Sequence, residues 1–518
     1  MSERADSEIA PATRIMLTVC VMMATIMQAL DTTIANVALP YMQGALSTTQ
    51  DQINWVLTSY IVAAAIMTSP IGWFSTRFGQ KNLFIICAAG FTVASMLCGA
   101  AQSIEQMVLF RLLQGVFGAA LVPLSQTVML DIYPPAQRGS AMAVWGMGVM
   151  LGPIMGPTLG GWLTDNYSWR WVFFVNLPFG VLTVLGLSAF MKESKRNSNL
   201  PFAWFGFLTL SLGIGALQMM LDRGEDQGWF GSAEIVTEAI LAVVGFYLFL
   251  ADSFTSRRPF IPLAIFRDWN FAIALIFMFL IGVILLATLA LVTPYLQNLM
   301  GYPVLASGFL LGSRGVGTFF SMMIVGRLLA KFDARILIFL GLALSTASLW
   351  FMVYWSPESS ARAIVIVSLA QGVGLGLVFV PLNTLAFATL SPKIRTDATA
   401  MWTLIRNLGS SIGISIVIAR LTTMSTSFHS QLAEQISPFN DALRAPTVSQ
   451  ILSTTTDTGR ALLEALITQQ AAIMAYSNDF LLMTWVSLAA FPLLFLLRST
   501  KAQAQSAAAR EEHAAAID

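Results

Sequence analysis

The chain has 518 residues, of which 56% are hydrophobic and 11% are charged, and its mean hydropathy is +0.72. About 25% of a soluble domain is charged, so this composition excludes a soluble enzyme and a disordered chain. The net charge of +1 gives no reason to expect a nucleic-acid partner. Three cysteines and two histidines exclude a disulfide scaffold and argue against a metal cluster. We therefore expect a polytopic membrane protein.

Apolar runs of about 20 residues, long enough to cross a bilayer, occur fourteen times between polar breaks. They lie near 15–37, 54–75, 82–101, 106–130, 139–162, 171–191, 202–221, 233–252, 271–296, 304–328, 335–354, 362–386, 398–419 and 480–498. The first run is too long for a cleaved signal peptide, and its later part is too polar. The sequence thus predicts an all-α polytopic membrane protein with fourteen transmembrane helices.

The basic residues give the orientation of these spans. With both tails on one side, nineteen of the 28 Lys and Arg residues fall on that side and six on the other. The remaining three, Arg111, Arg314 and Arg406, lie within spans. Because loops rich in Lys and Arg stay in the cytoplasm, we expect both termini to be cytoplasmic.

Two similar basic segments indicate an internal repeat. Gly72-Trp-Phe-Ser-Thr-Arg77-Phe-Gly79-Gln-Lys81 is expected in the loop after the second span, and 326–335 in the loop after the tenth. Two parallel six-helix halves would explain this spacing, whereas two ordinary basic turns are the alternative.

The expected domains follow from this repeat and from a polar linker at 192–199. We predict an N-terminal half at 1–192, two inserted helices at 193–262, a C-terminal half at 263–500 and a cytoplasmic tail at 501–518. The segment 421–478 is expected to be a long non-cytoplasmic loop, whose part from Leu462 to Phe480 forms a helix that leads into the last span.

Several motifs carry a resemblance to a known family. They are Leu30-Asp31-Thr-Thr-Ile-Ala-Asn36-Val-Ala-Leu-Pro40, Arg111-Leu-Leu-Gln114-Gly115-Val-Phe-Gly118, Gly152-Pro153-Ile-Met-Gly156-Pro157-Thr-Leu-Gly160-Gly161, Tyr133-Pro-Pro135, Trp169-Arg-Trp171, Asn176-Leu-Pro178 and Leu221-Asp-Arg-Gly224. Together they resemble the major facilitator superfamily, specifically its fourteen-helix drug–proton antiporters of the EmrB/QacA type, over residues 15–500. The resemblance implies a major facilitator fold with six, two and six helices.

The chain departs from the family pattern in its loop motif and in its seventh span. The family has an Asp where this chain has Thr76, a basic residue where it has Gln80, and an Asp where it has Ala203. The first change removes a carboxylate from the cytoplasmic gate and puts the usual gate ion pair in question. The resemblance assigns four residues to this gate loop: Gly72, Arg77, Gly79 and Lys81.

Asp31 is the one carboxylate well inside the first span. A charge in hydrocarbon costs at least about 3 kcal/mol, so Asp31 should face a cavity, pair with a cation or take up a proton. Helical spacing puts it on one face with Met27, Gln28 and Ala35, which we expect to line a drug cavity. A structural aspartate near the outer interface is the alternative.

Arg111 is the expected partner of Asp31, since it shares a helix face with Gln114, Gly115 and Gly118. An arginine keeps its proton in proteins, so it would act as a fixed counter-charge near Asp31. The alternative is an arginine that reaches to the outer interface. We assign proton coupling to four residues: Asp31, Arg111, Gln114 and Gln28.

The fifth span carries a glycine at every fourth position, at Gly148, Gly152, Gly156 and Gly160. Small residues at this spacing allow close helix packing in a membrane, and Pro153 and Pro157 bend the helix. The resemblance places this segment between the two halves and implies a hinge. Packing alone is the alternative.

Four more polar residues are cavity candidates: Asn36, Arg314, Arg406 and Asn407. With one clear carboxylate opposite three arginines, the cavity would be net positive when Asp31 is protonated. Such a cavity would favour anionic lipophiles, for example fatty acids or bile acids. Alternatively, backbone carbonyls satisfy Arg314 and Arg406.

The sequence lacks a Gly-x-x-x-x-Gly-Lys-Ser/Thr phosphate loop, so we expect neither an enzyme nor a cofactor. The resemblance implies a bacterial inner-membrane exporter that uses the proton gradient to remove lipophilic compounds. It also implies a periplasmic membrane-fusion adaptor and, through it, an outer-membrane channel. We expect the adaptor to bind 421–478, with a self-packed lid as the alternative.

Three other functions stay open at this point. They are a siderophore or fatty-acid exporter, a solute symporter, and a membrane scaffold or sensor that transports nothing.

Overall fold

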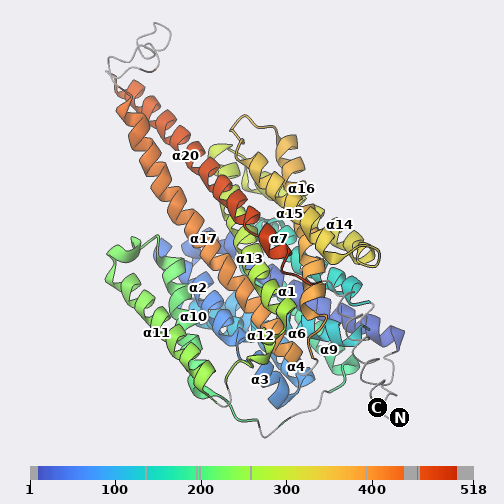
Figure 1. The fold of residues 1–518 in the computed structure, drawn as a ribbon. Coiled ribbons are helices and arrows are strands. Elements are labelled where there is room, and N and C mark those ends of the chain that lie inside the picture. The colour runs from blue at the N-terminus through green and yellow to red at the C-terminus, as the bar shows by residue number, and fades with distance from the viewer. Residues whose placement is uncertain are drawn as a thin grey trace, which may run out of the picture.

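The computed structural model describes residues 10–134, 137–193, 197, 200–256, 259–391, 394–436, 452 and 456–498. Every regular element within these ranges is a helix (Figure 1). In chain order they are α1 (Pro11–Ala45), α2 (Gln50–Thr68), α3 (Ile71–Phe78), α4 (Gln80–Ala100), α5 (Ile104–Gly118), α6 (Leu121–Ile132), α7 (Arg138–Asn166), α8 (Trp171–Phe174), α9 (Asn176–Phe190), α10 (Trp204–Arg223), η2 (Trp229–Gly231), α11 (Ala233–Thr255), α12 (Ala264–Arg267), α13 (Trp269–Pro294), η3 (Tyr295–Leu299), α14 (Val304–Leu328), α15 (Ala334–Met352), α16 (Ala361–Phe387), α17 (Arg395–Glu434), α20 (Asp457–Leu488) and α21 (Phe491–Leu494).

In the described part of the chain, thirteen helical segments are long and apolar enough to cross a membrane. A further pair, α2 and α3, passes the same test together but is bent by 60°. Counted as one span, this pair brings the total to the fourteen that the sequence predicts. The bend falls at Pro70, which has no backbone N–H to continue the helix.

The first basic motif is helical, so the prediction of a loop from Gly72 onward is wrong. Helix α3 contains Gly72 and Arg77, and the chain reverses only at Gly79, whose φ is 87°. L-residues rarely adopt a positive φ, so the glycine there ends α3 and begins α4.

The helices form two groups with the same internal pairing. In the N-terminal group (α1–α9), α1 packs on α7, α2 on α5, and α4 on both α5 and α9. In the C-terminal group (α13–α21), α13 packs on α17, α14 on α16, and α15 on both α16 and α20. The packing therefore repeats along the chain.

The helices between the two groups lie at the edge of the bundle (Figure 1). Helix α10 contacts α2 and α17, and α11 contacts α10. Helix α11 turns large apolar side chains outward, among them Val243 at 69%, Tyr247 at 71% and Phe254 at 77% exposure. In a membrane such a face meets lipid.

We call the end of the bundle with Lys81, Arg138, Arg335 and Arg498 the basic end. The two groups meet there through polar side chains of α6, α16 and α17. Gln126 Nε2 donates to Asn383 Oδ1 over 2.7 Å, Thr127 and Thr399 share a 2.7 Å hydrogen bond, and Asp131 pairs with Arg395. These contacts close the bundle at the basic end.

Most of the segment 421–478 that the structure describes is helical. The prediction of a loop is therefore wrong for 421–434, whereas the predicted helix from Leu462 to Phe480 is confirmed as part of α20. Helix α17 runs on to Glu434, and α20 begins at Asp457. Between Gly413 and Glu434 the sequence has no Gly or Pro to stop the helix. The threonines of this stretch donate to carbonyls one turn back, as Thr423 does to Ala419.

The distal parts of these two helices, 421–434 and 457–478, project beyond the other helices as one pair (Figure 1). We call this pair the α17–α20 extension. Arg420 lies 3.1 Å from buried Asp479 at its base, and His429 lies 2.8 Å from Glu464 further out. Residues 437–451 and 453–455, much of the linker 192–199 and the tail 501–518 lie outside the described residues.

Candidate functional site

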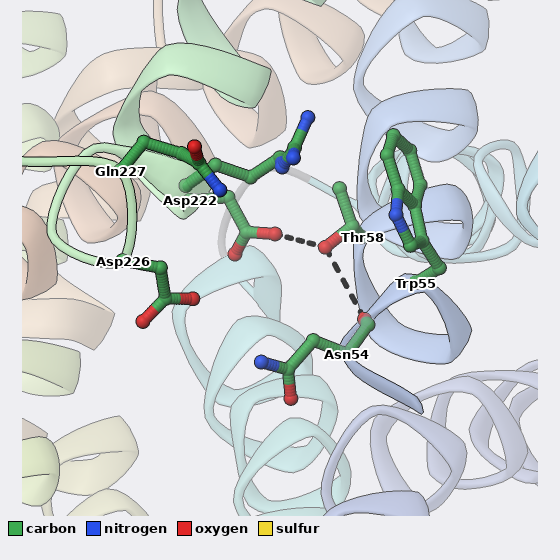
Figure 2. Close-up of a pocket in the computed structure, with 7 residues that line it drawn as sticks. Asn54, Trp55, Thr58, Asp222, Asp226 and Gln227 are labelled. Carbon is green, nitrogen blue, oxygen red and sulfur yellow. Dashed lines mark hydrogen bonds between the residues drawn. The ribbon is translucent and has the colours of Figure 1, made fainter. Parts of the chain in front are cut away.

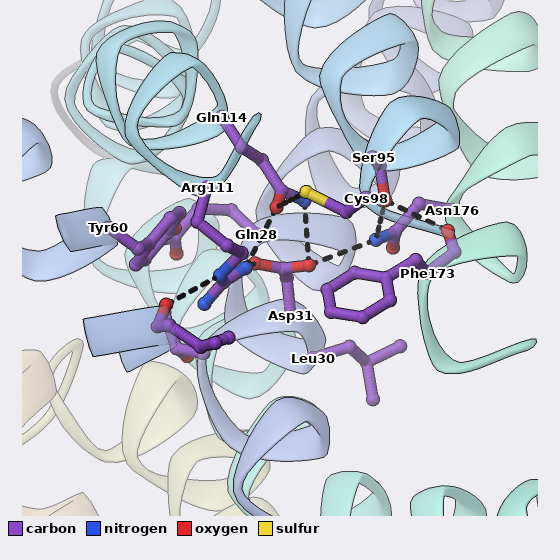
Figure 3. Close-up of polar contacts among 12 residues, drawn as sticks. Gln28, Leu30, Asp31, Tyr60, Ser95, Cys98, Arg111, Gln114, Phe173 and Asn176 are labelled. Atoms are coloured by element: carbon purple, nitrogen blue, oxygen red, sulfur yellow. Dashed lines mark hydrogen bonds and ion pairs between the residues drawn. The ribbon is translucent and has the colours of Figure 1, made fainter. Parts of the chain in front are cut away.

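Asp31 lies at the centre of a buried polar network in the N-terminal group (Figure 3). Its Oδ2 lies 2.7 Å from Arg111 Nη1, and its Oδ1 accepts from Gln114 Nε2 at 2.8 Å and from Asn176 Nδ2 at 3.2 Å. The side chains of Asp31 and Arg111 are 0% and 1% exposed. The structure thus brings together three of the four residues to which the sequence assigned proton coupling.

Arg111 is held from several sides. Its Nη1 also donates to Gln114 Oε1 at 2.8 Å, and its Nε donates to Val56 O at 3.0 Å. The guanidinium carbon lies 4.3 Å from the centre of the Tyr60 ring and 5.7 Å from that of Phe173. Such stacking stabilises a cation away from water. The arginine therefore does not reach to an outer interface.

Asn176 and Ser95 belong to this network, although the sequence analysis gave them no role. Asn176 Nδ2 also donates to Ser95 Oγ at 3.0 Å, and Ser95 Oγ donates to Phe173 O at 2.8 Å. The available signal was the motif Asn176-Leu-Pro178, which was noted only as part of a resemblance. Ser95 had no such signal, because a lone serine in an apolar span is common.

The expected cavity-lining face of α1 is instead packed inside the N-terminal group. Met27, Asp31 and Ala35 are all 0% exposed, because α5 and α9 place their polar side chains on this face. Gln28 is partly buried and donates to Tyr60 Oη at 3.3 Å. Asn36 is exposed and stands apart from the network. In the described conformation, Asp31 therefore has no contact with solvent.

Asp31 and Arg111 depend on each other as a buried ion pair. One cation, Arg111, and two amide donors, Gln114 and Asn176, contact the carboxylate. Protonation would remove the charge opposite Arg111 and leave a buried cation with one partner fewer, which costs several kcal/mol unless the helices rearrange.

The residues of the predicted gate loop lie at the basic end. Lys81 Nζ donates to Ser188 O at 2.7 Å, and Thr76 Oγ1 donates to Gly72 O at 3.0 Å. Arg77 lies half-buried near the end of α3. An ideal Cβ placed on Gly72 would lie 1.5 Å from Asp397 Oδ1, a side chain of α17.

At the basic end, Thr76 replaces the aspartate of the family. Other helices supply carboxylates there. Asp397 packs against Gly72 from the C-terminal group, and Asp131 of α6 pairs with Arg395 of α17. The Asp131–Arg395 ion pair joins the two groups directly. No pattern in the sequence predicts it, because 264 residues separate its members.

The glycine stripe of α7 faces α1 of its own group. An ideal Cβ on Gly152 would lie 2.3 Å from the carbonyl carbon and oxygen of Ala29, and one on Gly156 would lie 2.0 Å from Thr33 Oγ1. Gly148 and Gly160 meet side chains of α1 in the same way. Helix α7 also contacts α14 of the other group, but through a different face, where Ile154 meets Gly315.

Pro153 and Pro157 lie half-buried within the unbroken run of α7. Thr33 Oγ1 donates to Gly152 O at 3.0 Å, so α1 hydrogen-bonds to α7 next to Pro153. The close α1–α7 contact therefore includes both the glycines and a polar link.

The remaining cavity candidates lie in the C-terminal group. Arg314 of α14 is buried, and its Nη2 donates to Leu285 O at 3.1 Å. Arg406 of α17 is half-buried beside Asn407, with 3.4 Å between Arg406 Nη2 and Asn407 Oδ1. No ion pair between described residues includes either arginine.

A small cavity opens between α2 and α10 (Figure 2). Its lining includes Asn54, Trp55 and Asp222, and Asp222 accepts a hydrogen bond from Thr58. The cavity volume is about 30 Å³, whereas sites for small organic ligands occupy roughly 300–1,000 Å³. This cavity has room for water but not for such a ligand.

Comparison with known proteins identifies the relatives of the chain. Residues 21–414 match the model of the Major Facilitator Superfamily. The chain is 34% identical over 484 residues to the multidrug export protein EmrB of Escherichia coli K12, covering 93% of this chain and 94% of that protein. It is 33% identical over 483 residues to the fatty acid resistance protein FarB of Neisseria gonorrhoeae, covering 92% and 94%.

A solved structure shares the fold. The proton:xylose symporter XylE, bound to 6-bromo-6-deoxy-D-glucose, superposes with a TM-score of 0.55 at 13% identity, covering 92% of this chain and 95% of that one.

The α1–α7 contact predicts a stability difference between two glycines of α7. Gly152→Ala should destabilise the protein by about 1–3 kcal/mol, because its Cβ would overlap the backbone of Ala29. Gly161→Ala should not, since the nearest atom to an added Cβ there is Val37 Cγ1 at 3.9 Å. The melting temperatures of the purified variants measure this difference. Equal melting temperatures would show that α1 and α7 are not closely packed at Gly152.

Proposed function

Because the chain belongs to the Major Facilitator Superfamily, we propose that it is a secondary active exporter in which proton entry drives the efflux of lipophilic compounds. The observation that carries this proposal is the buried Asp31–Arg111 pair, a titratable carboxylate in the middle of a membrane span. Ionisable residues at such depth mark proton or substrate pathways. Relatives named as multidrug exporters, at 34% identity over nearly the whole chain, support the same function.

We place Asp31 in the role of proton carrier and Arg111 in that of fixed counter-charge. Gln114 and Asn176 hold the ionised form by hydrogen bonds. The carboxylate has no access to solvent in this conformation, so a proton can reach or leave it only when the helices around it move. This requirement ties proton transfer to conformational change, as antiport demands.

Alternating access follows from how the two helix groups meet. At the basic end they are joined by Asp131–Arg395, Gln126–Asn383 and Thr127–Thr399. We propose that the basic end faces the cytoplasm, as the distribution of Lys and Arg predicts. The described conformation is then closed toward the cytoplasm, and these contacts must break before substrate can enter.

The proton gradient supplies enough energy for useful export. One charge moving through about 100 mV yields about 2.3 kcal/mol. Since about 1.4 kcal/mol corresponds to a tenfold ratio, one proton per cycle sustains a substrate gradient of roughly fiftyfold. No cofactor is needed for this mechanism.

Transport in proteoliposomes tests the proposal. An acidic lumen at pH 6 against pH 7.5 outside should drive accumulation of ethidium in vesicles whose protein has its cytoplasmic side outward. Nigericin, which collapses the pH difference, should abolish the accumulation. Accumulation that ignores the pH gradient would exclude proton antiport, and none at all would exclude ethidium as a substrate.

Replacement of the carboxylate gives a sharper prediction. Asp31→Asn keeps an oxygen to accept from Gln114 and Asn176 but removes the charge, so gradient-driven ethidium uptake should fall to background. Ethidium binding without a gradient should persist. Glu105→Gln, at the exposed start of α5, is the matched control and should transport normally. Normal uptake with an unchanged pH response in Asp31→Asn would remove Asp31 from coupling.

We further propose that the α17–α20 extension binds a periplasmic adaptor of the membrane-fusion type, through which the exporter would reach an outer-membrane channel. The extension carries apolar side chains on its surface, with Leu462 and Leu466 each 43% exposed and Met474 39% exposed. Leu462 and Leu466 are one turn apart and share a face. Exposed apolar stripes on a projecting helix pair favour a protein partner.

Crosslinked membranes test this partner. Replacing 430–470 by a short Gly-Ser linker, or introducing Leu462→Gln with Leu466→Gln, should strongly reduce recovery of the adaptor with the exporter. Gln470→Ala, a change at an exposed polar site, should leave recovery intact. If adaptor recovery persists without the extension while efflux is lost, the extension acts as a lid and not as a docking site.

A further inference from the structure

The C-terminal group holds a buried carboxylate of its own, Asp479 of α20. Its side chain is 0% exposed, and Arg420 Nε of α17 lies 3.1 Å from Asp479 Oδ1. The two groups approach without an aligned hydrogen bond, and neither carboxylate oxygen has a hydrogen-bond partner among the described residues. Burial penalises an ionised carboxylate that accepts no hydrogen bond, and binding of a proton removes its charge.

Apolar and aromatic side chains enclose Asp479. Tyr476 and Met483 lie about one turn before and after it on the same face of α20 and are 7% and 1% exposed. The ring of Tyr476 lies 5.2 Å from that of Tyr295, the first residue of the π-helical segment η3. Tyr295 Oη is also buried without a hydrogen-bond partner in the described part of the chain. The carboxylate therefore lies in surroundings that favour its neutral form.

This ion pair differs from the Asp31–Arg111 pair in both members. Asp31 accepts two amide hydrogen bonds, and the side chain of Arg111 is 1% exposed. Asp479 accepts none from the described residues, and the side chain of Arg420 is 35% exposed. Protonation of Asp31 would leave a buried cation unpaired, whereas protonation of Asp479 would leave Arg420 in contact with water. Of the two carboxylates, Asp479 thus takes up a proton at the lower cost.

The Arg420–Asp479 pair lies at the base of the α17–α20 extension, opposite the basic end. Arg420 follows Arg395 on α17 by 25 residues, or about 37 Å. Arg395 pairs with Asp131 of α6 at the basic end. An ion pair thus holds α17 near each end of its membrane span, to α6 at one end and to α20 at the other. Loss of the Arg420–Asp479 pair would act on α17 at the far end alone.

Few other ionisable groups face Asp479 in the described part of the chain. They are the phenols of Tyr476 and Tyr295, with the exposed Glu358 beyond them. Of the other helices that pack on α20, α13 has no charged residue, and the one in α15, Arg335, lies at the basic end. Arg420 is therefore the charge that protonation of Asp479 would release.

We propose that Asp479 is a second proton-binding site, and that its protonation lets α17 and α20 separate at the base of the extension. One proton binds to a carboxylate oxygen of Asp479, the ion pair with Arg420 breaks, and water replaces Asp479 beside the guanidinium group. The site lies outside the Asp31 network. Its test measures a proton and a distance, so it does not depend on the export function proposed above.

Infrared difference spectra between pH 8 and pH 5.5 measure the proton directly, on purified protein in phosphatidylcholine nanodiscs. Exposed aspartates titrate near pH 4, so they contribute little in this range. The wild-type protein should gain carbonyl absorption of a protonated carboxyl group on acidification. Asp31→Asn should retain this gain and Asp479→Asn should lose it. Retention of the gain in Asp479→Asn would overturn the proposal.

Further out on the extension, His429 and Glu464 form another contact that responds to pH. A histidine gains charge between about pH 8 and pH 5, and that charge would strengthen its contact with Glu464. Acidification would therefore draw the two helices together through His429 and let them separate through Asp479. Because the two effects have opposite signs, a distance measurement distinguishes them.

Spin labels on Thr426→Cys and Gln470→Cys, at exposed sites of the two helices, report that distance by double electron–electron resonance. The three native cysteines are buried and should escape labelling. With Asp479 intact, the labels should shift to longer separations from pH 8 to pH 5.5. With Asp479→Asn they should show the longer separation at both pH values.

Control variants complete the distance experiment. His429→Gln and Glu105→Gln, the latter at an exposed acid of α5, should each keep the shift. If Asp479→Asn fails to fold, Arg420→Gln decides the question, since it also breaks the pair and should show the longer separation throughout. A separation that does not change with pH, or a shift that persists in Asp479→Asn, would overturn the proposal. A shift lost only in His429→Gln would assign the response to the His429–Glu464 contact instead.

Discussion

The cost of an unpaired charge in hydrocarbon governs how this bundle is built. In the N-terminal group, the charge of Asp31 is paired with Arg111 and accepts hydrogen bonds from Gln114 and Asn176, all within the fold. The pair contributes little net stability, because desolvation offsets most of its attraction. Its consequence is specificity, since these four side chains fix how α1, α5 and α9 pack together.

Close backbone contact links the helix that carries Asp31 to the rest of the bundle. The glycines of α7 bring it against α1, the helix of Asp31, while Ile154 on another face of α7 meets Gly315 of α14. Helix α7 thus contacts both α1, which carries Asp31, and the opposite group. The polar contacts that close the basic end lie on α6, α16 and α17, so a shift of one group against the other has to break them together. Such an all-or-none contact set favours two discrete states.

Much of this architecture could be predicted from the sequence, because long apolar runs and the Lys and Arg bias report directly on membrane spans. The proximity of Asp31 and Arg111 could be anticipated, because a charge buried in a membrane requires a partner of opposite charge. The Asp131–Arg395 pair could not, since neither residue lies in a motif and only the folded chain brings them together. The α17 part of the α17–α20 extension was missed because hydropathy detects spans and not helices that continue beyond them, whereas the α20 part was predicted from Leu462 onward. The sequence also could not show which helix the glycine face of α7 meets, because that depends on tertiary packing.

The asymmetry between the two groups suggests why proton and substrate can be exchanged. The N-terminal group balances its buried charges internally, whereas among the described residues the C-terminal group holds Arg314 and Arg406 in no ion pair. A proton on Asp31 would change the electrostatic cost of the N-terminal group alone, and a substrate held by the C-terminal group would act on the other half. Both halves share the α7–α14 contact. Coupling between two such sites requires only that each ligand favours a different arrangement of that shared contact.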